Sequence, residues 1–370
     1  MKGVSADRLA VLISFSGEGG VERMVTNLVL EFARRPDLEV DLVLLRDDSR
    51  HLQVVPPQVR VVRLGVRHSA LSLPALVRYL RRARPAALLV AKDRAGRAAL
   101  LARMLAGVPT RIVLRLGTTL SEAMQDRSGL SRWLRYWPIR RLYPRLERIV
   151  AVSQGVADDI AAIAGLPAER IVVIRNPVIT PELERLAAAA PEHPWLAADG
   201  PGVVLGIGRL TRQKDFPTLI RAFAQLRRQR ALRLILLGEG RDREALQALA
   251  RQEGVEADVA MPGFQTNPYA WLARARLFVL SSRWEGSPNA LTEAMALGVP
   301  VVATDCHSGP RELLAGGRFG PLVPVGDING LAAAIAGVLD RPLSAEELKA
   351  AVREYDAHES ARRYLRVLGL

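Results

Sequence analysis

The chain has 370 residues, of which 49% are hydrophobic and 24% charged, a length and composition that fit two globular domains and exclude an intrinsically disordered protein. Its one cysteine, Cys306, excludes an intramolecular disulfide and a cysteine-based zinc cluster, and is typical of a protein from a reducing cytoplasm. The apolar run at 9–15 is too short for a bilayer, and no other segment reaches about 18 uncharged residues, so no transmembrane helix is expected.

The formal net charge of +14 lies almost entirely in the first half of the chain. Residues 1–180 carry 29 Lys/Arg and 16 Asp/Glu, residues 181–370 carry 23 and 22, and the segment 51–150 alone carries 20 and 4. Such a field attracts phosphate groups, anionic lipid or nucleic acid. Arginine supplies 48 of the 52 cations, so a GC-rich coding sequence explains part of this basic character equally well.

In the first half, short β-branched or leucine-rich runs alternate with helical stretches, which is the βαβ pattern of a parallel sheet covered on both faces. Strands are expected at 9–15, 40–45, 59–65, 87–91 and 111–116, with helices at 21–35, 73–84 and 95–107. A segment rich in Trp, Tyr and Arg follows at 131–145, and a helix is expected after Ser153.

The same pattern restarts at residue 202 and predicts a second doubly wound domain over 202–343. The first domain is expected to span 1–180, and the Pro- and Ala-rich stretch 181–201 is expected to connect the two. Residues 344–370 are expected to form a C-terminal helix that packs back on the first domain. The loops GIGRL, GEGR, PGFQTN and SRWEGSPN follow the strands of the second domain and should converge on one crevice, where doubly wound sheets bind ligands.

The stretch GIGRLTRQKDF at 206–216 combines a glycine turn with two cations. Gly206 and Gly208 permit a tight turn from strand to helix, and Arg209 and Lys214 place positive charge beside it, which suits a diphosphate. GEGR at 238–241 repeats the design after the next strand. Glycine turns and basic loops are common, so this motif alone is weak evidence.

The stretch EGSPNALTEAMAL at 285–297 carries two carboxylates eight positions apart. Pro288 and Asn289 mark the start of a helix, so Glu285 lies in the loop before it and Glu293 about one turn inside it. The two carboxylates are then too far apart to act as one dyad, and we expect them to hold two ends of a long ligand that carries hydroxyl groups, such as a nucleotide sugar. The alternative is that Glu285 caps the helix and Glu293 lies on the surface.

These motifs together resemble the retaining glycosyltransferases of family 4. GIGRLTRQKD, LLGEG, MPGF, EGSPNALTEAMALGVPVVAT and GPREL resemble the second domain of that family, and GEGGVERM at 17–24 and AVSQGVADDI with IRNPV over 151–178 resemble its first domain more loosely. The resemblance implies an α/β architecture of the GT-B type, with two Rossmann-like doubly wound domains facing a central cleft. It covers nearly the whole chain.

The resemblance also implies roles for the matched positions. Glu285 would contact hydroxyls of the transferred sugar, Glu293 would hold the ribose, and Arg209 and Lys214 would neutralise the departing β-phosphate in place of a metal ion. No metal or organic cofactor is expected, and the chain has no Asp-x-Asp motif. The remaining donor-binding positions implied by the family are Gly208, Phe264 at the base, Gly286, Ser287, Pro288 and Asn289 at the sugar-diphosphate, and Gly19 and Gly20 from the first domain.

One position departs from the family pattern. Relatives often carry a histidine in the strand-end stretch that here reads RLGTT at 115–119, and Gly117 occupies its place. Either Arg115, Thr118 or Thr119 replaces the histidine's contact to the sugar, or the site is built differently.

The family resemblance predicts transfer of a hexose or N-acetylhexosamine from a UDP-sugar, with retention, to a lipid-linked, lipopolysaccharide or polysaccharide acceptor in bacterial envelope synthesis. The segment 131–145 mixes Trp and Tyr with Arg, as interfacial membrane segments do, so peripheral contact with the inner face of the cytoplasmic membrane is one interpretation and an ordinary amphipathic helix is the other. No nucleic-acid partner is expected. Three alternatives remain open: a sugar-nucleotide epimerase or a phosphorylase on the same architecture, and a basic membrane- or nucleic-acid-binding protein without catalysis.

Overall fold

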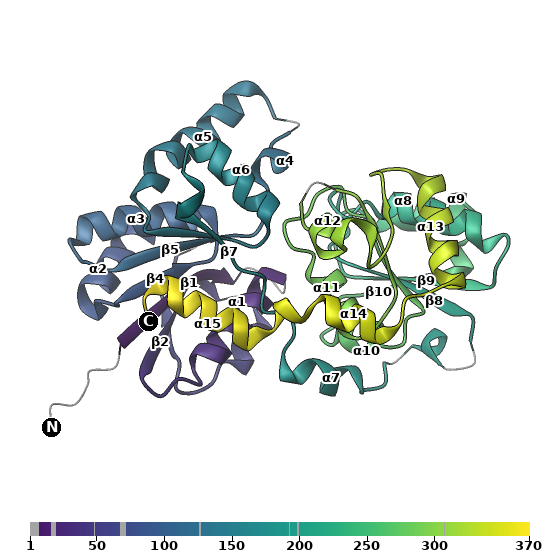
Figure 1. Ribbon diagram of the computed structural model, residues 1–370, viewed down its shortest axis with the longest axis horizontal. Coiled ribbons are helices and arrows are strands. Elements are labelled where there is room, and N and C mark those ends of the chain that lie inside the picture. The colour runs from purple at the N-terminus through teal and green to yellow at the C-terminus, as the bar shows by residue number, and fades with distance from the viewer. Residues whose placement is uncertain are drawn as a thin grey trace. The chain divides into compact units, whose positions relative to one another are not determined.

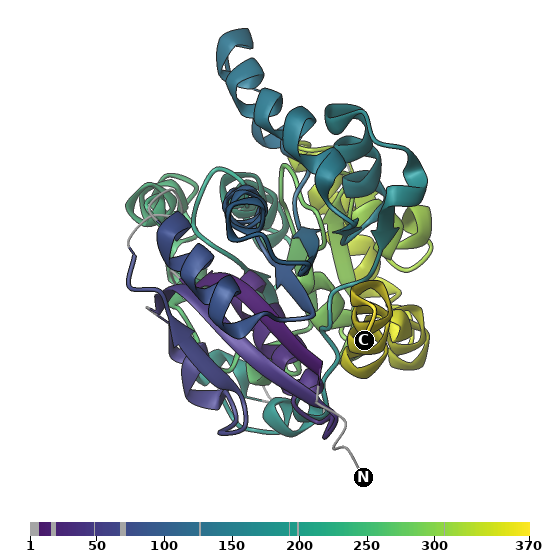
Figure 2. The same cartoon turned by 90° about the vertical axis from the view of Figure 1, so that its left-hand side faces the viewer.

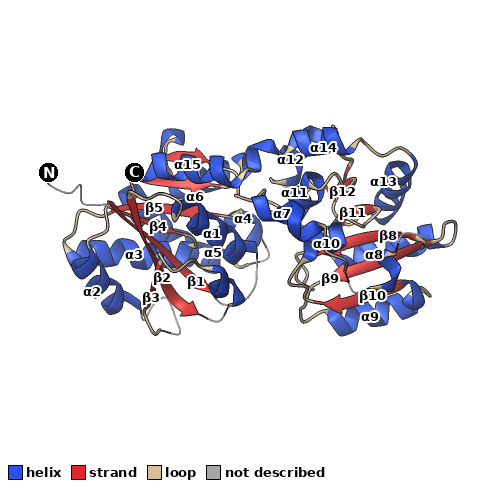
Figure 3. Cartoon of the chain, turned by 90° about the horizontal axis from the view of Figure 1, so that it is seen from below, coloured by secondary structure: helices blue, strands red, loops and turns tan. Residues whose placement is uncertain are grey.

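The computed structural model describes residues 7–15, 20–47, 49–66, 72–125, 127–191, 193–197, 200–306 and 308–370. The chain divides into two compact units, unit 1 (Met1–Val178 with Tyr355–Leu370) and unit 2 (Ile179–Glu354). Each unit is a parallel sheet between helices, as the red strands and blue helices of Figure 3 show. This two-domain α/β architecture is the one that the alternating pattern predicts.

Unit 1 contains a seven-stranded sheet of order β3-β2-β1-β4-β5-β6-β7, and its pairings are parallel. Its strands are apolar runs because helices cover both faces of the sheet; β4, for example, is buried at all four positions. The strands are β1 (Asp7–Phe15), β2 (Leu38–Asp47), β3 (Arg60–Arg63), β4 (Ala87–Val90), β5 (Arg111–Leu116), β6 (Arg148–Ala151) and β7 (Ile171–Val173).

The helices of unit 1 form two layers, one on each face of the sheet (Figure 1). One layer consists of α2 (Leu73–Ala83), α3 (Asp93–Ala106), α5 (Gly129–Leu142) and α6 (Gln154–Ala164), with the short α4 (Leu120–Ala123) packed on α6. The other consists of α1 (Gly20–Phe32) and α15 (Ala357–Leu368). The predicted helix start after Ser153 is confirmed, since the Ser153 hydroxyl accepts a hydrogen bond from the Val156 amide as the N-cap of α6.

Unit 2 contains a six-stranded parallel sheet of order β10-β9-β8-β11-β12-β13. The strands are β8 (Gly202–Ile207), β9 (Leu232–Leu237), β10 (Val259–Gly263), β11 (Leu277–Leu280), β12 (Val301–Thr304) and β13 (Leu322–Val323). The helices are α7 (Pro181–Ala187), α8 (Phe216–Arg227), α9 (Arg243–Gln252), α10 (Pro268–Leu272), α11 (Asn289–Ala296), α12 (Pro310–Leu313), α13 (Ile328–Asp340) and α14 (Ala345–Ala351).

Two expected boundaries differ from the structure. The stretch 181–201, expected as a connection, belongs to unit 2, because α7 packs on α10 and Asn267 and Arg274 donate hydrogen bonds to the carbonyls of Leu186 and Ala187. The stretch 344–370, expected as one C-terminal helix, is two helices in different units: α14 contacts α11 in unit 2, and α15 packs on α1 in unit 1.

Candidate active site

Three loops at the carboxyl end of the unit 2 sheet are joined by backbone hydrogen bonds. The Gly208 amide donates to the Leu237 carbonyl and the Leu210 amide to the Glu239 carbonyl, each at 2.9 Å, and the Gly238 amide donates to the Gly263 carbonyl at 2.9 Å. The loops after β8, β9 and β10 therefore form one rigid edge, as the sequence pattern predicts for strand ends of a doubly wound sheet.

Glycines make this close approach of the loops feasible. A Cβ atom on Gly238 would lie 2.1 Å from the Gly208 carbonyl oxygen, and one on Gly240 would lie 2.2 Å from that of Leu210. Gly238 also has a φ of +133°, a conformation that side chains rarely adopt. The glycines of the GEGR motif thus serve loop packing, a role that its spacing alone does not reveal.

Lys214 and Glu285 meet beside this edge. The Lys214 Nζ atom lies 2.6 Å from the Glu285 Oε1 atom, and the Ser282 hydroxyl donates to the same oxygen at 2.7 Å. Both side chains are largely buried, with 17% and 9% exposed. Glu285 is therefore held by a cation and a hydroxyl, and it is not the cap of α11, whose N-cap position is Pro288.

The loop that carries Lys214 is fastened to the loop that carries Glu285. The Ser281 hydroxyl donates to the Lys214 carbonyl at 2.7 Å, the Arg283 amide donates to the Gln213 carbonyl at 2.8 Å, and the Gln213 side chain donates to the Trp284 carbonyl at 3.0 Å. These contacts fix Lys214 and Glu285 in one geometry, which lowers the ordering cost of binding a ligand there.

Arg209 is exposed and is held at its tip by Gln213, with 3.4 Å between its Nη2 atom and the Gln213 Oε1 atom. It does not share the ion pair of Lys214. The edge therefore presents one cation that is neutralised by Glu285 and a second, solvent-accessible cation that an anionic ligand can bind directly.

The start of α11 is tightly packed on its neighbours. A Cβ atom on Gly309 would lie 2.8 Å from Cδ of Pro288 and 3.0 Å from the Gly286 carbonyl oxygen. The Ser287 hydroxyl oxygen is buried and lacks a hydrogen-bond partner within the part of the chain that the structure describes. Such a hydroxyl costs stability unless a ligand or water satisfies it, so the Ser287 hydroxyl is available to a bound ligand. Asn289 is the first residue of α11.

Glu293 lies inside α11 with 2% of its surface exposed. The alternative that Glu293 is a surface residue is therefore wrong.

Phe264 follows Gly263, whose φ is +88°, and is 44% exposed at the end of β10. An exposed aromatic ring at a strand end offers a flat apolar surface on which a base can stack.

In unit 1, Gly20 begins α1, whereas Gly19 lies outside the described residues. The sequence reasoning missed Lys92, which follows β4. Its Nζ atom donates to Glu22 Oε1 and to the Ser14 carbonyl, each at 2.9 Å, and Glu22 is 6% exposed in the first turn of α1. A lysine directly after the buried run ALLVA, in a chain with four lysines, was the available signal.

Arg115 accounts for the glycine at position 117. Its Nη2 atom donates to Asn176 Oδ1 at 2.7 Å, and a Cβ atom on Gly117 would lie 2.3 Å from its Nη1 atom. Burial lowers the pKa of the Arg115 guanidinium, an effect that Tyr364 and Glu22 oppose. The guanidinium thus fills space that a side chain at 117 would need. Of the other two candidates, Thr118 is exposed and Thr119 is fully buried.

Two known protein families match long stretches of the chain. The family described as "Glycosyl transferase 4-like domain" matches residues 19–177, and "Glycosyl transferases group 1" matches residues 192–355, so the two matches together cover most of both units. The chain is a family 4 glycosyltransferase.

A relative along the full length is the N-acetylgalactosamine-N,N'-diacetylbacillosaminyl-diphospho-undecaprenol 4-alpha-N-acetylgalactosaminyltransferase of Campylobacter jejuni, 29% identical over 98% of this chain and 99% of that protein. Among solved structures, Anabaena Alr3699/HepE in complex with UDP-glucose has a TM-score of 0.78 at 20% identity, covering 98% of this chain and 99% of that one. The lipopolysaccharide outer core galactosyltransferase WaaB has a TM-score of 0.69 at 22% identity, with the same coverage. These likenesses establish the GT-B fold.

In this family 4 glycosyltransferase, unit 2 brings together Gly208, Arg209, Lys214 and Glu285 through the loop contacts given above, with Gly286, Ser287, Pro288 and Asn289 directly after Glu285. No helix among the described residues is long and apolar enough to cross a membrane. Within the same part of the chain, no group of three or more His, Cys, Asp or Glu residues is placed to hold a metal ion.

Proposed function

We propose that this glycosyltransferase transfers a hexose or N-acetylhexosamine, with retention and without a metal ion, from a UDP-sugar to a lipid-linked, lipopolysaccharide or polysaccharide acceptor of the bacterial envelope. The observation that carries the proposal is the Lys214–Glu285 pair at 2.6 Å with the exposed Arg209 beside it. One carboxylate and two cations at a strand edge match a sugar diphosphate, which has hydroxyls at one end and phosphates in the middle.

In the reaction, the bond between the anomeric carbon and the β-phosphate oxygen breaks, and the bond to the acceptor oxygen forms on the same face. Because the acceptor attacks from the face that the phosphate leaves, no protein nucleophile is needed. The proton of the acceptor hydroxyl passes to the departing β-phosphate, so no protein base is needed either. Lys214 and Arg209 stabilise the negative charge that grows on that phosphate, which is the task that a divalent metal performs in other transferases.

The ion pair gives Lys214 two roles in this scheme. Before the donor binds, its ammonium neutralises the buried carboxylate of Glu285. A bound β-phosphate offers the ammonium a second anion, so part of the positive charge shifts toward the phosphate while Glu285 accepts hydrogen bonds from sugar hydroxyls. Glu293, buried on α11, would accept the hydroxyls of the ribose.

The choice of UDP and of the acceptor rests on the relatives. HepE has been solved with UDP-glucose, and the Campylobacter jejuni relative acts on a sugar linked through diphosphate to undecaprenol. An acceptor of that kind is anchored in a membrane by its lipid, so we also propose that the chain works at the inner face of the cytoplasmic membrane.

The test is thermal stabilisation and turnover with UDP-, GDP- and ADP-sugars, comparing the unmodified protein with Glu293→Ala and Lys214→Ala. We expect one nucleotide class to stabilise the protein and both substitutions to weaken that effect. Lys349→Ala is the matched control, because its ammonium pairs with Glu184 at 3.8 Å on the surface of unit 2. Stabilisation by no donor would contradict the proposal.

Two further readouts separate the finer claims. NMR of the product reports whether the anomeric configuration is kept. Activity that persists in excess EDTA supports metal independence, and activity that EDTA abolishes and Mg²⁺ or Mn²⁺ restores would overturn it.

A further inference from the structure

Exposed apolar side chains of unit 1 are concentrated on two neighbouring helices. Ten large hydrophobic side chains are exposed in the described part of the chain, and seven of these lie on α3 and α5. The two helices are in contact, since Arg135 and Tyr143 of the α5 region both bind Asp93 of α3. The seven residues are Leu101, Met104, Leu105, Leu130, Trp133, Leu134 and Trp137. Clusters of exposed apolar side chains on one region mark an interaction surface.

The stripe on α5 has the spacing of one helix face. Leu130, Trp133, Leu134 and Trp137 stand at positions i, i+3, i+4 and i+7, and each is between 51% and 69% exposed. The first six residues of α5 are all exposed, and Figure 2 shows this helix standing out from the rest of unit 1. The later part of α5 attaches to the core through the buried Ile139 and the partly buried Tyr136 and Leu142.

The same helices carry an unbalanced positive charge. The sequences of α2, α3 and α5 contain ten arginines and one carboxylate, Asp93. Asp93 is 8% exposed and is already paired with Arg97 at 3.3 Å and Arg135 at 2.6 Å. These three helices therefore expose arginines and no carboxylate, which gives their outer side a strong attraction for anions.

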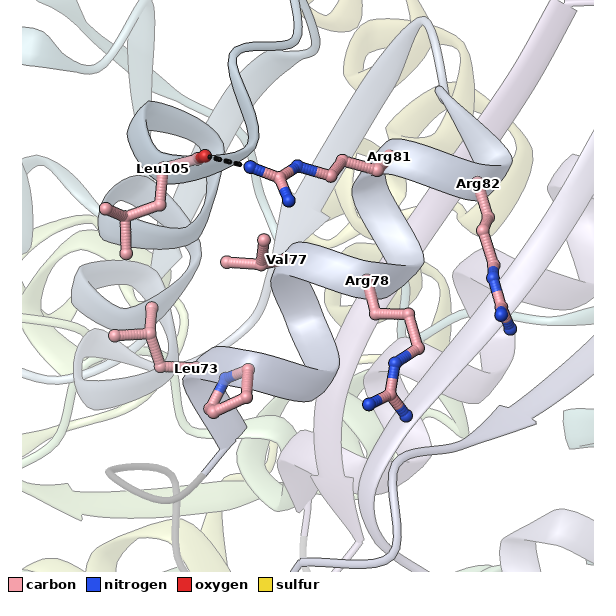
Figure 4. A pocket seen from close by; sticks show the side chains of 7 residues that line it. Leu73, Val77, Arg78, Arg81, Arg82 and Leu105 are labelled. Atoms are coloured by element: carbon pink, nitrogen blue, oxygen red, sulfur yellow. Dashed lines mark hydrogen bonds between the residues drawn. The ribbon is translucent and has the colours of Figure 1, made fainter.

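A groove between α2 and α3 repeats the combination of apolar and cationic groups (Figure 4). It has a volume of about 590 Å³ and is lined by Leu73, Pro74, Val77, Arg78, Arg81, Arg82 and Leu105. Arg81 spans it, donating from Nη2 to the Leu105 carbonyl at 2.9 Å. Apolar walls with a cationic rim suit a lipid, whose acyl chains and phosphate meet at such a boundary.

We propose that the α5 stripe inserts into the interface of an anionic phospholipid bilayer, with the arginines of α2, α3 and α5 binding lipid phosphates. This deepens the proposed function, on which its biological purpose rests, by assigning the surface that brings the enzyme to a membrane-held acceptor. Tryptophan at the headgroup level and arginine beside it are the side chains that anchor helices lying in a bilayer interface.

Two other occupants fit the surface less well. A second copy of the chain would bring the same arginines face to face, and like charges oppose such a contact. Nucleic acid could stack on the two tryptophans, but it offers nothing apolar to Leu130, Leu134, Leu101 and Met104, whereas acyl chains do.

The experiment is sedimentation with vesicles of neutral phosphatidylcholine, with or without phosphatidylglycerol, in the absence of donor and acceptor. We expect binding to the anionic vesicles that weakens at high salt. The double variant Trp133→Ala/Trp137→Ala and the double variant Arg132→Glu/Arg141→Glu should each lower the partition coefficient by about tenfold or more. The double variant Arg228→Glu/Arg341→Glu, which changes exposed arginines of unit 2, is the charge-matched control. Its partition coefficient should fall much less.

Brominated acyl chains give a direct readout of insertion. They should quench fluorescence of the unmodified protein and leave the double variant Trp133→Phe/Trp137→Phe unquenched. Equal binding by the α5 variants and the unmodified protein, binding to neutral and anionic vesicles alike, or tighter binding of a single-stranded oligonucleotide than of anionic vesicles would each overturn the proposal. Because no sugar donor is present, failure here leaves donor turnover standing, and failure of turnover leaves vesicle binding standing.

Discussion

At the scale of single residues, we expect the Lys214–Glu285 pair to couple stability to catalysis. Replacing Lys214 by Met leaves Glu285 buried without its cation, and an uncompensated buried charge is costly. We expect Lys214→Met to lower the unfolding free energy by about 2 kcal/mol, since the partial exposure of the pair softens the cost. We expect kcat/KM to fall by about 10²–10³-fold, because the phosphate loses a positioned cation. Urea unfolding and steady-state kinetics measure the two effects.

The double variant Lys214→Met/Glu285→Gln separates the two effects. It removes both charges, so most of the lost stability should return while activity stays low. Recovery of activity in the double variant would show that Lys214 acts only by neutralising Glu285. Lys349→Met serves as the control, since its exposed pair with Glu184 contributes little.

Arg115 and Gly117 give a second prediction at this scale. Introducing the histidine that the family resemblance implies at this position, as Gly117→His, should destabilise this chain by about 1–3 kcal/mol, because the new Cβ atom would meet the Arg115 guanidinium at 2.3 Å. The same substitution should cost less when Arg115 is replaced by Ala. A double-mutant cycle on the unfolding free energy measures this coupling, and we expect about 1 kcal/mol or more. Additive losses would show that Arg115 moves aside freely.

At the scale of elements, the loops after β8 and β9 depend on two glycines. Gly238→Ala would place a methyl group 2.1 Å from the Gly208 carbonyl oxygen, and the backbone there cannot yield without breaking the Gly208–Leu237 hydrogen bond. We expect a loss of about 2–4 kcal/mol in unfolding free energy. We also expect a larger loss of donor affinity than of kcat, because Arg209, the residue after Gly208, would be displaced together with the Gly208 carbonyl. Gly337→Ala is the matched control: it lies in α13 with no atom within 4 Å of the new Cβ, so stability should stay equal or rise by up to about 1 kcal/mol. Calorimetry and donor titration test both.

The strands and the two doubly wound domains could be predicted from the sequence because parallel strands buried on both faces are continuous apolar runs, such as ALLV in β4. The GT-B fold was implied only by the family resemblance. The convergence of Lys214 and Glu285 could also be anticipated, since both follow strands whose carboxyl ends share one edge. Their direct contact at 2.6 Å could not, because side chains 71 positions apart are brought together by loop packing that no local pattern encodes.

Two other segments show what local sequence patterns could not predict. The stretch 181–201 has the composition of a connection, yet α7 is fixed to unit 2 by Asn267 and Arg274, which lie more than 80 positions away. The segment 131–145 is rich in aromatic and basic residues, but its sequence alone does not say which face of a helix meets the core. Only the structure shows that Trp133 and Trp137 point outward while Ile139 is buried.

At the scale of the whole molecule, buried phenols are distributed unequally between the two units. Five of the six tyrosines belong to unit 1. Burial, together with Asp41 for Tyr79 and Asp93 for Tyr143, raises the pKa of both phenols well above its ordinary value, and burial also raises the pKa of Tyr364. The Tyr79 hydroxyl donates a buried hydrogen bond of 2.6 Å to Asp41, and this bond is lost if the phenol is deprotonated.

The sign of the resulting pH dependence follows from proton counting. Below about pH 10, phenols are protonated in both the folded and the unfolded chain, so they do not change how the unfolding free energy varies with pH. Above it, the unfolded chain releases protons that the folded chain keeps, so stability falls as pH rises, by up to about 1.4 kcal/mol per pH unit for each phenol. Unit 1 should therefore lose stability faster than unit 2 between about pH 9.5 and 11.5.

Hydrogen exchange read by mass spectrometry resolves the two units, because each peptide reports the opening of its own segment. Peptides from β4 and β5 of unit 1 should lose protection with a steeper pH dependence than peptides from β8 and β11 of unit 2, after correction for the intrinsic exchange rate. Tyr79→Phe removes one of the four unit 1 phenols whose pKa is raised, which are Tyr79, Tyr136, Tyr143 and Tyr364. The pH dependence of stability in unit 1 should therefore become shallower, even though the variant loses its hydrogen bond to Asp41 and starts from a lower stability. An unchanged slope in Tyr79→Phe would show that the phenol does not control alkaline unfolding. Equal slopes in the two units would place the alkaline sensitivity outside the phenols of unit 1.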